Sequence, residues 1–102
     1  MNFDLLREYH RLLCNTEEML TLHNQKQWVN VLQEWRGELT STMTDLDLRQ
    51  HVVRTARALG GIGSISEIAL LGRDEPFKKL LDALYESCSQ IYKLALNQRI
   101  PG

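Results

Sequence analysis

Cysteines, long apolar runs and an excess of either charge are what this sequence has least of. Its two cysteines, Cys14 and Cys88, are too few and too far apart for a disulfide framework or a zinc knuckle, so we expect two reduced thiols. No apolar run approaches the roughly 20 residues of a membrane span, and the first residues lack the basic and apolar regions of a signal peptide. We therefore expect a cytoplasmic protein that does not associate with membranes.

The formal net charge is −1, which gives no electrostatic reason to expect nucleic acid as a ligand. The charges are nevertheless spread unevenly. Residues 1–47 hold eight acids and four bases, whereas residues 48–102 hold five acids and eight bases. Either the two halves attract each other in the fold, or the protein offers a partner two differently charged faces.

The length of 102 residues suits one hydrophobic core and is too short for two ordinary domains. Hydrophobic residues make up 43% of the chain and charged residues 25%, which is close to the globular average and unlike a disordered chain. We predict a single helical domain over residues 1–102 that folds without a partner.

Apolar residues recur at steps of three and four, the period of an amphipathic helix. The first stripe predicts a helix over residues 3–22. A second helix is expected from a cap at Asn24 to about residue 39. Thr44 and Asp47 have capping spacing before a third helix that ends at Gly60, a residue suited to a left-handed C′ position.

Two more helices are expected after this point. A short helix follows Ser64 and stops at Gly72, and the acids and proline of residues 74–76 then favour a new start. The last helix, over about residues 75–97, has an apolar arc wider than one neighbour covers. The predicted fold class is all-α: an irregular four-helix bundle with one additional short helix after a glycine-rich corner.

The glycine-rich corner is the most distinctive local feature. Gly60, Gly61 and Gly63 allow positive φ and close backbone approach, while Ser64 and Glu67 have capping-box spacing. Backbone N–H groups before a helix can bind an anion, but the corner lacks a P-loop lysine and a preceding strand. We interpret it as a structural corner between helices and keep anion binding as the alternative.

The sequence shows no catalytic or metal-binding constellation. His10 and Cys14 lie four residues apart on one helix face, but the other histidines have no matching partner motif. Cys88 lies in an apolar stripe, where a thiol behaves as a small buried hydrophobe. The carboxylates fall on polar faces or helix starts, where solvation and the helix dipole explain them.

Arginines and tryptophans supply the remaining candidates. Three bases on the third predicted helix, at residues 49, 54 and 57, lack interleaved aromatics and therefore suit a solvated face or an acidic partner better than a nucleic-acid groove. Trp28 and Trp35 lie on the same side of their helix, so we expect both in the core. The alternative is that one of them is an interface anchor.

The tryptophan-bearing run Trp28-Val29-Asn30-Val31-Leu32 is followed about thirty residues later by the segment 58–68, which contains the glycine corner. This pattern resembles a family of small bacterial helical proteins with a Gly-Gly-Met-Gly-Ser-hydrophobic-Asn-Asp box. The resemblance covers residues 5–96, with Ile62 at the methionine and Ser66-Glu67 at the Asn-Asp pair. Proteins of this type resemble immunity proteins, which block a toxin's active or cofactor site and have no activity of their own.

We predict a stoichiometric protein-binding inhibitor, an immunity protein that neutralises a cognate antibacterial toxin without a cofactor or metal. Toxins that act on nucleotides often present basic clefts, so we expect acids of the first two helices and exposed aromatics to form the contact surface. The residues expected there are Glu17, Glu18, Glu34, Glu38, Trp35, Tyr85 and Tyr92. The alternatives are a helical adaptor or homodimer that uses the last helix, and a nucleotide-binding protein or enzyme that uses the glycine corner.

Overall fold

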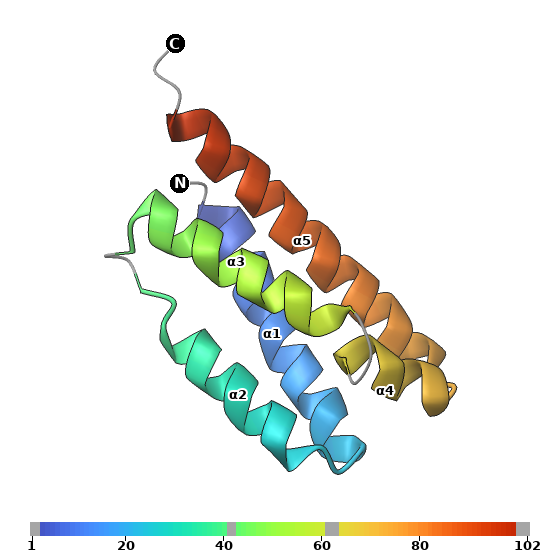
Figure 1. Ribbon diagram of the computed structural model, residues 1–102. Helices are drawn as coiled ribbons and strands as arrows, with labels where there is room; N and C mark the ends of the chain where they lie inside the picture. Colours follow the sequence, from blue (N-terminus) through green and yellow to red (C-terminus); the bar gives the residue numbers. More distant parts are fainter. Residues whose placement is uncertain (1–2, 41–42, 61–63, 100–102) are drawn as a thin grey trace.

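Five helices account for the secondary structure of the computed structural model, which describes residues 3–40, 43–60 and 64–99 (Figure 1). They are α1 (Phe3–Leu22), α2 (Lys26–Gly37), α3 (Asp45–Leu59), α4 (Ile65–Leu71) and α5 (Glu75–Arg99). No strand occurs among these residues, so the all-α prediction is confirmed. The helix boundaries agree with the apolar stripes to within two residues.

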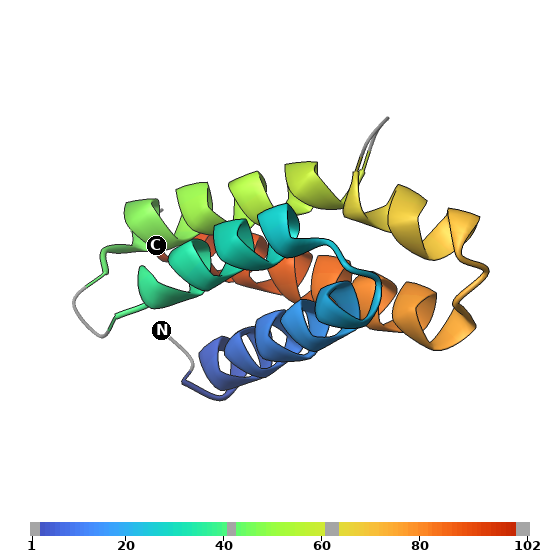
Figure 2. The ribbon, with the colours of Figure 1, turned by 90° about the horizontal axis from the view of Figure 1, so that it is seen from below.

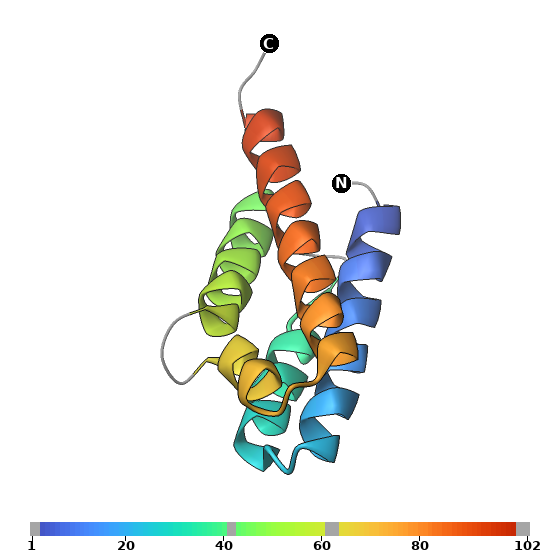
Figure 3. The same cartoon turned by 90° about the vertical axis from the view of Figure 1, so that its right-hand side faces the viewer.

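The helices form two layers (Figure 2). One layer contains α1 and α5, and the other contains α2, α3 and α4. Helix α3 packs against α5, and α1 packs against both α5 and α2. The molecule measures 46 × 23 × 21 Å, and the C-terminal end of α5 projects beyond α1 and α3 (Figure 3).

The core draws on all five helices. Its buried apolar residues are Tyr9, Leu12, Leu13, Leu20, Leu32, Leu48, Val52, Leu59, Ile65, Ala69, Phe77, Leu81, Leu84, Cys88 and Ile91. Burying each large apolar side chain contributes about 1.5–3 kcal/mol. Trp28 and Trp35 are only half-buried and pack against the edge of this core, so the expectation that both lie inside it holds in part.

Side-chain caps fix several helix starts, because the first backbone N–H groups of a helix have no partner within it. The Thr44 hydroxyl accepts the Asp47 N–H and the Asp47 carboxylate accepts the Thr44 N–H, which confirms the predicted capping box. The Ser64 hydroxyl likewise accepts the N–H of Glu67 at the start of α4. At α5 the Asp74 carboxylate accepts the N–H of Phe77 at 3.0 Å.

The helix ends differ from the prediction. Asn24 was expected to cap α2, but it has a φ of 59° and terminates α1 in a Schellman arrangement, in which the Gln25 N–H donates to the Leu20 carbonyl. Arg73, with a φ of 52°, ends α4 in the same way. Gly60, predicted to be left-handed, is instead extended, with a φ of −119°. The left-handed backbone conformation expected at Gly60 is therefore found at Asn24 and Arg73 instead.

Residue 72 must be glycine because there is no room for a side chain. Its backbone conformation does not require glycine, since its φ is −79°. A Cβ at this position would lie 2.9 Å from Cε1 of His23 and 3.2 Å from the carbonyl oxygen of Ile68. His23 is itself held, because its Nε2 lies 2.9 Å from the Asp74 carboxylate and its ring stacks on Phe77. A side chain at residue 72 must therefore displace a fixed contact between α1 and α5.

We expect Gly72→Ala to destabilise the fold by about 1–2 kcal/mol, the cost of overpacking a fixed contact. Gly60→Ala is the matched control. Its extended φ suits alanine and no atom lies within 4 Å of the new Cβ, so we expect no loss and a gain of up to about 1 kcal/mol. Urea unfolding followed by tryptophan fluorescence measures both, and equal losses in the two variants would contradict the assignment.

Candidate functional site

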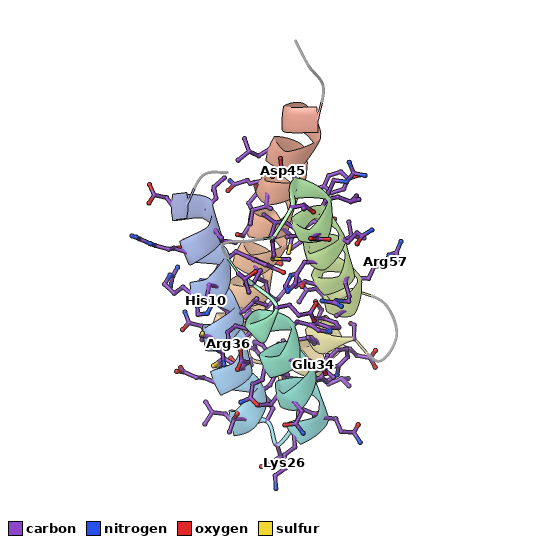
Figure 4. The ribbon with its side chains drawn as sticks, turned by 90° about the vertical axis from the view of Figure 1, so that its left-hand side faces the viewer. His10, Lys26, Glu34, Arg36, Asp45 and Arg57 are labelled. Atoms are coloured by element: carbon purple, nitrogen blue, oxygen red, sulfur yellow. The ribbon has the colours of Figure 1, made fainter. Side chains whose placement is uncertain are left out.

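The four glutamates expected to bind a partner do not form one acidic surface. Glu17 is 7% exposed, and its carboxylate accepts hydrogen bonds from Nε and Nη2 of Arg36 at 2.6 and 3.2 Å. The prediction that Glu17 lies on a solvated face was wrong. Helix α2 packs on α1 and brings Arg36 to the Glu17 carboxylate (Figure 4). Glu17 therefore joins two helices instead of facing a partner.

The other three glutamates are exposed, but one is already engaged. Glu18 on α1 and Glu34 on α2 reach solvent. Glu38 accepts a hydrogen bond from Nη2 of Arg54 at 2.7 Å, and the guanidinium carbon of Arg54 lies 4.8 Å from the ring centre of Trp35. Glu38 and Trp35 thus belong to a local contact between the end of α2 and α3.

Exposed aromatics gather instead between α3 and α5, which run side by side in opposite directions (Figures 1 and 3). Tyr85 is 57% exposed and Tyr92 is 37% exposed on α5. They border a groove of about 200 Å³, which we call the α3–α5 groove. Its lining residues are Val52, Val53, Ala56, Tyr85, Cys88, Ser89 and Tyr92. The groove therefore has an apolar floor and aromatic edges.

A row of arginines on α3 borders this groove. Arg49, Arg54 and Arg57 line a second hollow that shares Val53 and Tyr92 with the groove. The guanidinium carbon of Arg49 lies 5.6 Å from the ring centre of Tyr92, which is a cation–π contact. Arg57 points away from the bundle (Figure 4). The groove and the second hollow therefore adjoin at Val53 and Tyr92, with the tyrosines on α5 and the arginines on α3.

A buried polar cluster lies beneath the groove, at the meeting of α1, α3 and α5. The Tyr9 hydroxyl lies 2.8 Å from Nδ1 of His51 and 2.6 Å from Oγ1 of Thr55. The other ring nitrogen of His51, Nε2, lies 2.6 Å from the carbonyl oxygen of Trp35. Desolvation raises the pKa of the Tyr9 hydroxyl and raises the pKa of the neighbouring Cys88 thiol to about 12.

The proton positions in this cluster follow from its chemistry. A carbonyl oxygen only accepts, so Nε2 of His51 donates to Trp35, and Nδ1 of the neutral ring accepts from Tyr9. Tyr9 has one hydroxyl proton, which leaves Thr55 as the donor to the Tyr9 oxygen. Every member is satisfied with His51 neutral, and the hydrogen bonds of the cluster join α3, one wall of the groove, to α1 and α2.

Acid should weaken the fold through His51. Burial lowers the pKa of His51 below its ordinary value of 6.5, so the unfolded chain takes up a proton at a pH where the folded ring stays neutral. Stability should therefore fall as the pH drops below about 6.5, by at most about 1.4 kcal/mol per pH unit, until the folded ring also titrates. Urea unfolding between about pH 7.5 and 5 measures this slope. His51→Gln should flatten it, and an unchanged slope in that variant would contradict the mechanism.

The histidine and cysteine side chains considered as metal ligands or nucleophiles show little convergence. The Cys14 sulfur lies 3.8 Å from Nδ1 of His10, as their spacing of four residues predicts. Across residues 3–40, 43–60 and 64–99, no three His, Cys or carboxylate side chains are grouped so that they could hold a metal ion. Cys88 is buried as predicted.

Part of the glycine corner lies outside the described residues, namely Gly61 and Gly63. Of its remaining members, Gly60 is extended and exposed, and Ser64 is buried as the cap of α4, with Glu67 supplying the N–H that it accepts. The described part of the corner thus serves the start of a helix.

No protein-family model, curated protein or solved structure matches the chain. The family resemblance carried by residues 58–68 therefore stays a prediction. None of the described helices is long and apolar enough to cross a lipid bilayer.

Proposed function

We propose that the chain is a stoichiometric protein-binding protein of the immunity type, which neutralises a partner toxin by occupying part of its surface. The observation that carries this proposal is the α3–α5 groove, where Tyr85 and Tyr92 stand exposed beside an apolar floor and the α3 arginines. Tyrosine and arginine are enriched at the energetic centres of protein interfaces. We interpret the scaffold as an irregular four-helix bundle with one added short helix.

The geometry changes which surface we assign to the partner. Glu17 is used within the fold and Glu38 is paired with Arg54, so the acids of α1 and α2 supply only scattered charges. The α3–α5 groove supplies apolar and aromatic groups, and the adjoining hollow supplies the α3 arginines. We therefore propose that the partner presents an acidic surface, in contrast to the basic cleft expected from the sequence.

Co-expression with the product of the adjacent gene tests the proposal. Relief of that product's toxicity together with a 1:1 complex in light scattering is the expected result. Persistent toxicity with no complex at micromolar protein would overturn it. A homodimer through Tyr85 and Tyr92 is the second candidate, because both rings are exposed on one helix, and the same light-scattering measurement on the chain alone detects it.

A further inference from the structure

We infer that the α3–α5 groove binds an amphipathic helix of the partner. This helix carries two acidic residues about two turns apart, with apolar anchor residues between them in the sequence. This inference rests on the proposed function and specifies the element that the groove recognises. It follows from the volume of the groove, the spacing of its arginines and the charges on its two borders.

The volume of the groove suits side chains better than a small molecule. Ligand pockets for small molecules usually span about 300–1,000 Å³, whereas the apolar groove has about 200 Å³. The adjoining hollow has about 460 Å³, and three arginines line it. Its floor is formed by Val53 and Ala56 from α3 and by the buried Cys88 from α5. One or two apolar side chains from a helix laid between α3 and α5 would fill it.

The spacing of the α3 arginines determines the spacing expected for the acidic residues of the partner helix. Arg54 is already paired with Glu38, which leaves Arg49 and Arg57 for a partner. They lie eight residues apart on α3, or about 12 Å along the helix axis at 1.5 Å per residue. Arg49 stacks on Tyr92, and no side chain in the described parts of the chain pairs with Arg57. A partner helix parallel or antiparallel to α3 would match both guanidinium groups with acids two turns apart.

The mixed charge of α5 beside the groove argues against a polyanion. Helix α5 exposes Glu86 directly after Tyr85, and this carboxylate accepts a hydrogen bond from Gln90. The exposed base Lys93 follows Tyr92 on the same helix, so α5 carries both signs of charge, and the net charge of the protein is −1. Nucleic acid would therefore find no uniformly basic surface here. A helix whose acids face α3 meets the arginines without needing a basic α5.

A second copy of the chain does not supply the required element. Within the described helices, no pair of exposed acids spaced seven or eight residues apart encloses exposed apolar residues. The one pair with that spacing in a single helix, Glu75 and Asp82, encloses Lys78 and Lys79. The complementary helix therefore belongs to a different protein.

A designed peptide tests the inference. The probe is a fluorescein-labelled helical peptide of about 18 residues with two glutamates two turns apart and two leucines between them. Fluorescence anisotropy should show saturable binding to the full chain. Replacing both glutamates with lysines should weaken binding at least about tenfold, and the Arg49→Glu/Arg57→Glu variant should weaken binding of the original peptide equally. The lysine peptide should recover affinity for that variant.

Lys26→Glu is the matched control, since Lys26 is an exposed base at the start of α2, a helix that does not line the groove, and it lies at the end of the bundle (Figure 4). It should leave the affinity unchanged, and circular dichroism confirms that each variant is folded. Equal binding of the two peptides would overturn the inference. So would tighter binding of a single-stranded oligonucleotide at the same salt concentration, or a dimer that Val53→Asp converts to a monomer. A 1:1 complex with the adjacent gene's product that survives Arg49→Glu/Arg57→Glu would overturn the inference alone and leave the proposed function standing.

Discussion

Tyr9→Phe is expected to lower the free energy of unfolding by about 1–3 kcal/mol, although it removes a single oxygen atom. The loss leaves Nδ1 of His51 without a donor and the Thr55 hydroxyl without its acceptor, both in a region closed to water. An unsatisfied buried polar group costs its full desolvation, whereas a hydrogen bond exchanged with water costs little. Chemical denaturation followed by circular dichroism measures the difference.

Tyr85→Phe is the matched control for this prediction, because the same oxygen is removed from a ring that is 57% exposed. We expect a change within about 0.5 kcal/mol at this surface position. Thr55→Val should cost less than Tyr9→Phe, since the Tyr9 hydroxyl still donates to His51. A Tyr9→Phe variant as stable as Tyr85→Phe would show that the polar cluster does not stabilise the fold.

The apolar period of three and four residues located the four long helices, and the Ser64 cap and Gly72 located the short α4. Local signals also set several of their starts, since the Thr44 and Asp47 cap needs only groups three residues apart. The helix ends were predicted less well. Whether Asn24 caps the next helix or ends the previous one depends on how α1 and α2 pack, and the closeness of Gly72 to His23 joins segments 49 residues apart.

Contacts between side chains of different helices could not be predicted from the sequence for the same reason. Tyr9 fits an apolar stripe, and nothing near it indicates a partner 42 residues away in His51. Glu17 has the spacing of a polar face, and only the position of Arg36 on α2 shows that it is buried and paired. Periodicity assigns a residue to a face of its own helix, whereas burial depends on which neighbour covers that face.

The candidate site was recognised in pieces. The sequence predicted Tyr85 and Tyr92 as contact residues on one helix and three arginines on another. It showed no aromatic residues interleaved with the arginines. The fold supplies aromatic neighbours by packing α5 along α3, so that Tyr92 stacks with Arg49, 43 residues away. A surface formed by two helices that are far apart in the sequence has no linear motif.

Arg36→Met is the second large expected effect, with a loss of about 2–3 kcal/mol at neutral pH. Methionine keeps most of the apolar stem, but the Glu17 carboxylate remains buried without its guanidinium partner. Removing one member of a fully buried ion pair costs about 3–5 kcal/mol. We expect less because the Arg36 side chain is 31% exposed, which lets water reach the pair and screen it.

Two comparisons separate this burial effect from the simple loss of a charge. Arg11→Met removes the partner of Glu8, but both side chains are about half exposed, so solvent screens the pair and we expect no measurable change in stability. The double variant Glu17→Leu/Arg36→Met leaves no buried charge and should regain most of the stability lost in Arg36→Met, because an apolar pair of similar volume replaces a buried ion pair at little cost. If the double variant were less stable than Arg36→Met, the loss would come from packing between α1 and α2 and not from an unpaired carboxylate.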